Sequence, residues 1–126
     1  MDVEKIIKYW FNSAEEDLRV VDHLYEKGDY RHALFFGHLY LEKTMKAMIV
    51  SKTNEHAPYS HNLLFLAQKA AVVLPKDIED FLDEATHWSI AARYPDLNIT
   101  LIDQENCKNK ITKTKEIGRW LQSMPR

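Results

Sequence analysis

Apolar residues recur at intervals of three and four along nearly the whole chain, and this spacing constrains the fold more than any other feature. No stretch alternates apolar and polar residues as a half-buried strand would. With only three glycines and four prolines among 126 residues, long uninterrupted helices are expected. The first of them places one stripe of apolar side chains on a helix: Ile7, Trp10 or Phe11, Ala14, Leu18, Val21 and Leu24.

Residues that cap or break helices predict where each helix ends. Gly28 offers a left-handed residue after the first helix, and Asp29 can cap the second by accepting backbone N–H bonds. Pro75 ends the third helix, and Pro95 disfavours helical geometry at the residue before it, so the fourth ends near Arg93. The expected helices span about 3–27, 30–53, 60 or 61 to 74, and 77–93, and Thr100 or Asp103 caps a fifth. Together they predict an all-α, up-and-down bundle of about five helices in a single domain over residues 1–126.

The second helix is apolar nearly all the way round over residues 33–41. A helix with no polar face is covered on every side, so it is either the central helix of the bundle or part of a subunit interface. Gly37 in its interior costs about 0.5–1 kcal/mol relative to alanine, which suggests that another helix approaches closely there. Glu42, Lys43 and Lys46 follow and mark the point where this helix regains a solvent-facing side.

Composition favours an ordinary globular protein, with 45% apolar and 29% charged residues. Cys107 is the only cysteine, so no internal disulfide can form, and its place on an apolar stripe is typical of a small core residue. The acidic N-terminus lacks the features of a signal peptide. No apolar stretch approaches the ~20 residues that span a bilayer. A soluble cytoplasmic protein without membrane association is expected.

Charge is unevenly distributed along the chain. The net charge of -2 argues against a dedicated nucleic-acid binder, which usually carries a strong positive excess. Residues 104–126 nevertheless contain six basic and two acidic side chains. A basic final helix could meet phosphates, although such a helix is more often a solvated face opposite acidic neighbours.

The six histidines do not form a metal motif, because no two of them lie three or four residues apart on a helix. Asp83 and His87 have the spacing of four, but such a pair is usually a surface hydrogen bond. No metal and no cofactor is therefore expected.

The segment from Arg93 to Asp96 places a cation, a phenol and a carboxylate on a proline-stiffened turn at the exit of the fourth helix. An arginine there can hold a phosphate with two parallel N–H bonds. The alternative is an Arg93–Asp96 pair that only caps the helix end.

Several short segments, taken in order and spacing, carry a family resemblance. They are Trp10 with residues 14–18, then residues 28–36, 42–47, 60–63 and 93–96. Together they resemble the HEPN domain, a helical family named for nucleotide binding in higher eukaryotes and prokaryotes, and the resemblance covers nearly the whole chain. It implies a HEPN-like bundle that commonly forms homodimers and that, in stand-alone prokaryotic members, is often encoded beside a minimal nucleotidyltransferase. Glu42, Lys46 and His61 are then expected to fix the second helix against the third by polar contacts.

Many members of the family are metal-independent ribonucleases, whose signature is an arginine followed after about four to six residues by a histidine that moves a proton. Arg93 stands where that arginine belongs, but Asn98, Ile99 and Thr100 occupy the histidine positions. Asn98 can hydrogen-bond a phosphate or base but cannot act as a general base. His87 is a poor substitute unless the fourth helix ends early.

The leading hypothesis is a dimeric, non-catalytic partner of a minimal nucleotidyltransferase in a toxin–antitoxin-like pair. It would bind a nucleotide or RNA phosphate through Arg93, Tyr94, Asp96 and Asn98. One alternative is a metal-independent ribonuclease toxin that uses Arg93 with an unconventional proton-transfer group such as His87. The other is a purely structural dimerisation module in which Arg93 caps its helix.

Overall fold

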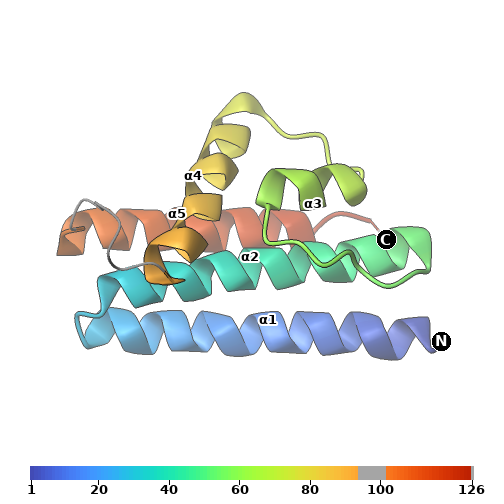
Figure 1. The fold of residues 1–126 in the computed structure, drawn as a ribbon, viewed down its shortest axis with the longest axis horizontal. Helices are drawn as coiled ribbons and strands as arrows, with labels where there is room; N and C mark the ends of the chain where they lie inside the picture. The colour runs from blue at the N-terminus through green and yellow to red at the C-terminus, as the bar shows by residue number, and fades with distance from the viewer. Residues whose placement is uncertain (94–101, 126) are drawn as a thin grey trace.

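The structure, a computed structural model, describes residues 1–93 and 102–125, with the backbone alone for residues 91–93. Within that part of the chain there are five helices and no strand, which confirms the all-α prediction: α1 Val3–Glu26, α2 Tyr30–Thr53, α3 Leu63–Lys69, α4 Lys76–Arg93 and α5 Gln104–Gln122. Figure 1 shows α1 and α2 antiparallel, α5 running in the direction of α2, and α4 lying across them. None of the described helices is long and apolar enough to cross a bilayer.

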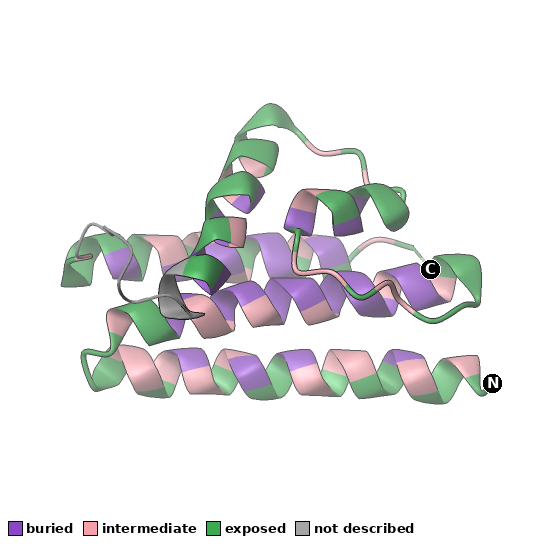
Figure 2. Ribbon diagram, in the orientation of Figure 1, coloured by how far each residue is buried: buried purple, intermediate pink, exposed green. Residues whose placement is uncertain are grey.

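The central helix of the bundle is α2. It packs against all four other helices, whereas α1 and α5 touch each other only slightly. Buried positions follow α2 along almost its whole length in Figure 2. The central-helix prediction is therefore confirmed, and the chain's own helices account for the apolar surface of α2 without a subunit interface.

The turn between α1 and α2 forms as predicted at Gly28, which has the left-handed φ of 79°. The Gly28 N–H donates to Tyr25 O at 3.0 Å and the Asp29 N–H to Leu24 O at 2.9 Å, the two bonds of a Schellman motif. The prediction that the Asp29 side chain caps α2 is wrong. The backbone at Asp29, with ψ of 67°, is not extended as it is at Asp103, which does cap its helix as expected.

The third helix is shorter than predicted at both ends. It begins after Asn62, whose side chain accepts the Phe65 N–H at 3.1 Å. It ends at Lys69 rather than near residue 74, because Ala71 takes the left-handed φ of 58° and Val72 N–H donates back to Ala67 O at 3.0 Å. Alanine rarely takes this conformation, so the sequence carries no signal for the early end.

Burial raises the pKa of two core groups, so the fold should lose stability in alkaline solution. Cys107, fully buried as expected, has its pKa raised from 9.0 to about 11, and Tyr40 has its pKa raised from 10.0 to about 12, in both cases chiefly through desolvation. Between these values the unfolded chain loses protons that the folded chain keeps, which favours unfolding.

We therefore expect the urea midpoint of unfolding to fall steadily as the pH rises from about 9 to about 12. Tyr40→Phe should remove the part of this fall that is due to the tyrosine, which begins near pH 10, and leave the part due to Cys107, which ends near pH 11. A midpoint that is independent of pH over this range would contradict the burial of both groups.

Candidate functional site

Arg93, the first of the residues predicted to bind phosphate, is the last residue of α4 that the structure describes. The Arg93 side chain lies outside the described part of the chain, as do Tyr94, Asp96 and Asn98. Positions 99 and 100, the other places where a histidine would stand, lie there too.

His87 is exposed on α4, and its Nδ1 lies 2.8 Å from the backbone O of Asp83, to which it can donate. The spacing of four thus gives the expected surface hydrogen bond, made to the backbone rather than to the Asp83 carboxylate. Because α4 remains helical through Arg93, His87 and Arg93 lie about 240° apart around its axis. The early helix end that His87 would need does not occur.

The structure instead assembles a polar cluster around one buried carboxylate, which we call the Glu42 cluster: His38, Glu42, Lys46 and His61. His61 Nδ1 lies 2.7 Å from Glu42 Oε1, and Lys46 Nζ lies 3.1 Å from Glu42 Oε2. The Glu42 and Lys46 side chains are only 5% and 7% exposed. The prediction that α2 regains a solvent-facing side here is therefore wrong, because each charge finds a partner that makes burial tolerable.

His38 extends the cluster to the backbone of the loop before α3. Its buried ring donates from Nε2 to the carbonyl O of His61 at 2.8 Å, and the same nitrogen is 3.8 Å from Glu42 Oε1. Two residues beyond His61, at the start of α3, the Leu63 N–H donates to the Thr86 hydroxyl of α4 at 3.1 Å. The polar contacts expected between α2 and the α3 region are thus present, and α4 joins them.

Two aromatic rings border the cluster. Lys46 Nζ lies 5.3 Å from the ring centroid of Trp10 and 6.0 Å from that of Tyr59. Tyr59 is 92% exposed and meets the His61 ring edge-on at 5.6 Å between centroids. A buried ion pair, a half-buried imidazole and an exposed aromatic ring therefore lie next to one another.

Comparison with known proteins accounts for this arrangement of helices. The profile of the HEPN domain matches residues 7–124. The chain belongs to the HEPN domain family. The crystal structure of TT1696 from Thermus thermophilus shares the fold of this HEPN chain, with a TM-score of 0.80 and 19% sequence identity over 92% of this chain and 95% of that chain. A search of curated proteins found no match.

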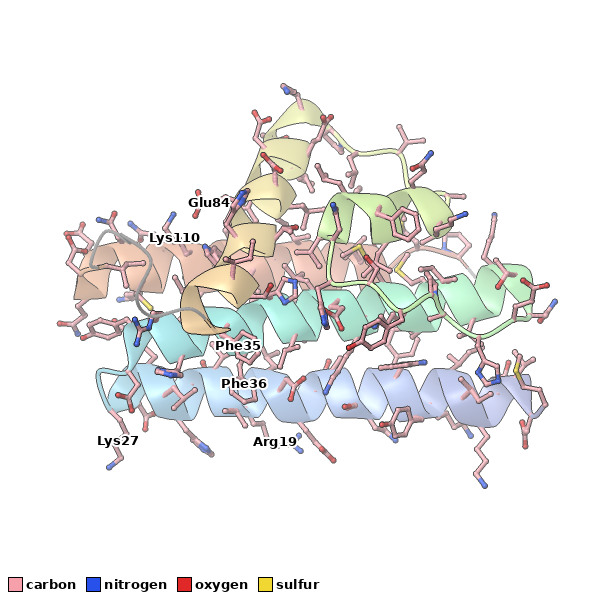
Figure 3. The ribbon with its side chains drawn as sticks, viewed as in Figure 1. Arg19, Lys27, Phe35, Phe36, Glu84 and Lys110 are labelled. Carbon is pink, nitrogen blue, oxygen red and sulfur yellow. The ribbon has the colours of Figure 1, made fainter. Side chains whose placement is uncertain are left out.

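The basic fifth helix of this HEPN domain faces acidic neighbours, which is the more common arrangement for such a helix. Figure 3 shows Glu84 of α4 beside Lys110 of α5, while Arg19 lies on the side of α1 that faces away from α2. Three lysines of α5 form ion pairs with acidic residues of α4 and α1: Lys110–Glu84, Lys113–Asp77 and Lys115–Asp22, the last at 2.8 Å.

Among the described residues, neither a metal site nor the main surface hollow adds a second cluster of reactive side chains. In the part of the chain that the structure describes, no group of three or more histidine, cysteine, aspartate or glutamate side chains could hold a metal ion. A hollow of about 400 Å³ lies between Phe11, Met48 and Leu121, but Lys52 is the one titratable side chain in its lining and no member of the Glu42 cluster reaches it.

Sequence reasoning missed His38 and Tyr59. The spacing of four between His38 and Glu42 was an available signal for the first, because such residues are neighbours on a helix. For Tyr59 there was none, since an aromatic residue in a loop is usually unremarkable in sequence. A second partly buried pair was also missed: Lys43 Nζ lies 2.8 Å from Asp17 Oδ2 and joins α2 to α1.

Proposed function

We propose that this HEPN protein is a dimeric, non-catalytic partner of a minimal nucleotidyltransferase in a toxin–antitoxin-like pair, and that it binds the phosphate of a nucleotide or RNA. Arg93, with Tyr94, Asp96 and Asn98, would make the phosphate contact. The observation that carries the proposal is that the HEPN match extends through Arg93, at the end of α4, while positions 98–100 hold no histidine.

Arginine without a neighbouring proton acceptor favours binding over cleavage. The guanidinium can hold two phosphate oxygens through parallel N–H bonds and keeps its charge at any physiological pH. Cleavage would also need a group that takes up a proton near neutral pH. His87, the candidate from the sequence, stands on a different face of α4 from Arg93.

The dimer and the nucleotidyltransferase partner are supported by the family relationship. Light scattering of the purified protein should give twice the mass of one 14.9 kDa chain. A minimal nucleotidyltransferase encoded beside this chain should co-elute with it when the two are co-expressed. A monomer that fails to bind such a partner would contradict this part of the proposal.

Arg93→Ala should weaken the binding of single-stranded RNA or nucleoside triphosphate by about tenfold, because a charge-assisted bidentate contact is lost. Fluorescence anisotropy with labelled RNA, and competition by the triphosphate, measure this. Arg19→Ala is the matched control, since Arg19 is exposed on the outer side of α1.

Two other results would favour the alternatives. If Arg93→Ala lowers the melting temperature and leaves affinity unchanged, Arg93 only caps α4. If the wild type degrades RNA with metal chelated and Arg93→Ala does not, the protein is a ribonuclease, and its expression should arrest growth.

A further inference from the structure

His61 is held in a fixed orientation by a carboxylate, yet part of its ring faces solvent. Its Nδ1 lies 2.7 Å from Glu42 Oε1, and its side chain is 32% exposed although that of Glu42 is only 5% exposed. Because the carboxylate accepts the Nδ1–H, the other ring nitrogen, Nε2, is left for a second partner. Within the described part of the chain, no residue makes a hydrogen bond to Nε2.

A purely structural role would not need this second nitrogen. The tie between α2 and the loop before α3 uses only Nδ1 and the backbone carbonyl of His61. An asparagine could make the same tie, because its amide N can occupy the place of Nδ1.

Tyr59 adds a flat apolar surface next to His61. Its side chain is 92% exposed, and contacts with His61 and Lys46 hold the ring beside the cluster. Such a ring can stack on a nucleic-acid base, since every base has a π-face and stacking does not require a particular sequence.

Helix α4 relates the position of Tyr59 and His61 to that of Arg93. Thr86 contacts the start of α3, two residues beyond His61, through its bond from Leu63 N–H. Residue 93 follows seven positions later in continuous helix, so it falls on the same face of α4 as Thr86, about 10 Å further along the axis.

We infer that Tyr59 and His61 form a contact site for one nucleotide of single-stranded RNA, in which Tyr59 stacks on the base and His61, with both ring nitrogens protonated, donates from Nε2 to a phosphate oxygen. The inference rests on the proposed function, in which Arg93 holds another phosphate of the same ligand. A site spread over two helical turns suits an oligonucleotide better than a mononucleotide.

The charges around His61 are consistent with an anionic ligand. Glu42 and Lys46 neutralise each other, and His38 and the Tyr59 phenol are the other titratable groups that meet the ring in the described part of the chain. A protonated His61 therefore gives the site one net positive charge.

The test measures binding of a fluorescein-labelled oligouridine of about eight nucleotides, in the presence of a metal chelator. His61→Asn keeps the bond to Glu42 and removes Nε2, and Tyr59→Leu removes the stacking surface without touching the core. Each should weaken affinity about tenfold. UTP, which offers only a single nucleotide, should compete poorly. His87→Asn is the matched control, because His87 is also exposed and also uses only Nδ1, and it should bind as the wild type does.

Each outcome separates this inference from the proposed function. If His61→Asn and Tyr59→Leu bind oligouridine normally while Arg93→Ala does not, the inference is wrong and the proposed phosphate contact stands. If UTP binds as tightly as oligouridine, the ligand is a mononucleotide and the RNA site is wrong. If the wild type binds neither probe, both proposals fail. Should His61→Asn unfold, as circular dichroism would show, Tyr59→Leu decides the matter because its side chain lies at the surface.

Discussion

Glu42→Ala should destabilise the protein by about 3–5 kcal/mol, because removing one partner of a buried ion pair leaves the other charge without compensation. Lys46 would keep its buried position, with 7% of its side chain exposed, and His61 would lose the acceptor that orients it. The loop before α3 would lose one of the two hydrogen bonds through which His61 joins it to α2. The urea midpoint of unfolding, followed by circular dichroism, measures the effect.

Glu84→Ala is the matched control for this experiment. Glu84 also pairs with a lysine, Lys110, but its side chain is 46% exposed, so the loss should stay within about 1 kcal/mol. Adding Lys46→Met to Glu42→Ala should restore most of the lost stability, since no unpaired charge then remains in the interior. A loss of less than about 1 kcal/mol for Glu42→Ala alone would mean that Lys46 reaches water when its partner is removed.

Gly118→Ala should destabilise the fold by about 3 kcal/mol, at the upper end of the range for overpacking in a core. A Cβ at this position of α5 would overlap the ring and hydroxyl of Tyr40 on α2. Tyr40 is 1% exposed and surrounded by packed side chains, so its ring has little room to move away. Thermal and urea unfolding of the variant would both show the loss.

Gly37→Ala provides the comparison within the same molecule. A Cβ at Gly37 would lie 3.6 Å from Thr114 Cγ2, an ordinary van der Waals distance, so this substitution should be neutral or stabilising by up to about 1 kcal/mol. Combining Gly118→Ala with Tyr40→Leu should cost much less than the sum of the two single changes, since the overlap disappears. Additive losses would show that Tyr40 is not the obstacle.

These two glycines show how far sequence reasoning reached. Gly37 was expected to mark a close helix approach, but a Cβ added there would meet side chains of α4 and α5 only at ordinary van der Waals distances. The tight approach lies at Gly118 of α5, where nothing in the local sequence distinguishes it. The sequence shows only that a glycine inside a helix costs stability. The reason for a glycine at position 118 is Tyr40, which lies 78 positions away in the chain.

The helices themselves were predictable because apolar periodicity is a local property. Their ends were predictable where a cap or breaker is written in the chain, as at Gly28 and Asp103, and not at Ala71, whose left-handed backbone has no sequence signal. The charged residues of α2 were misinterpreted for a related reason: whether Glu42 faces water depends on His61, which only the folded chain brings to it.

The ion pairs of α5 have a consequence for the rate at which a polyanion finds this protein. Three of the lysines that make the final helix basic are paired within the molecule, with Asp22, Asp77 and Glu84. At distances beyond a Debye length, about 8 Å in physiological salt, each such pair presents almost no net field. These three lysines therefore add little to the long-range attraction of any polyanion towards α5.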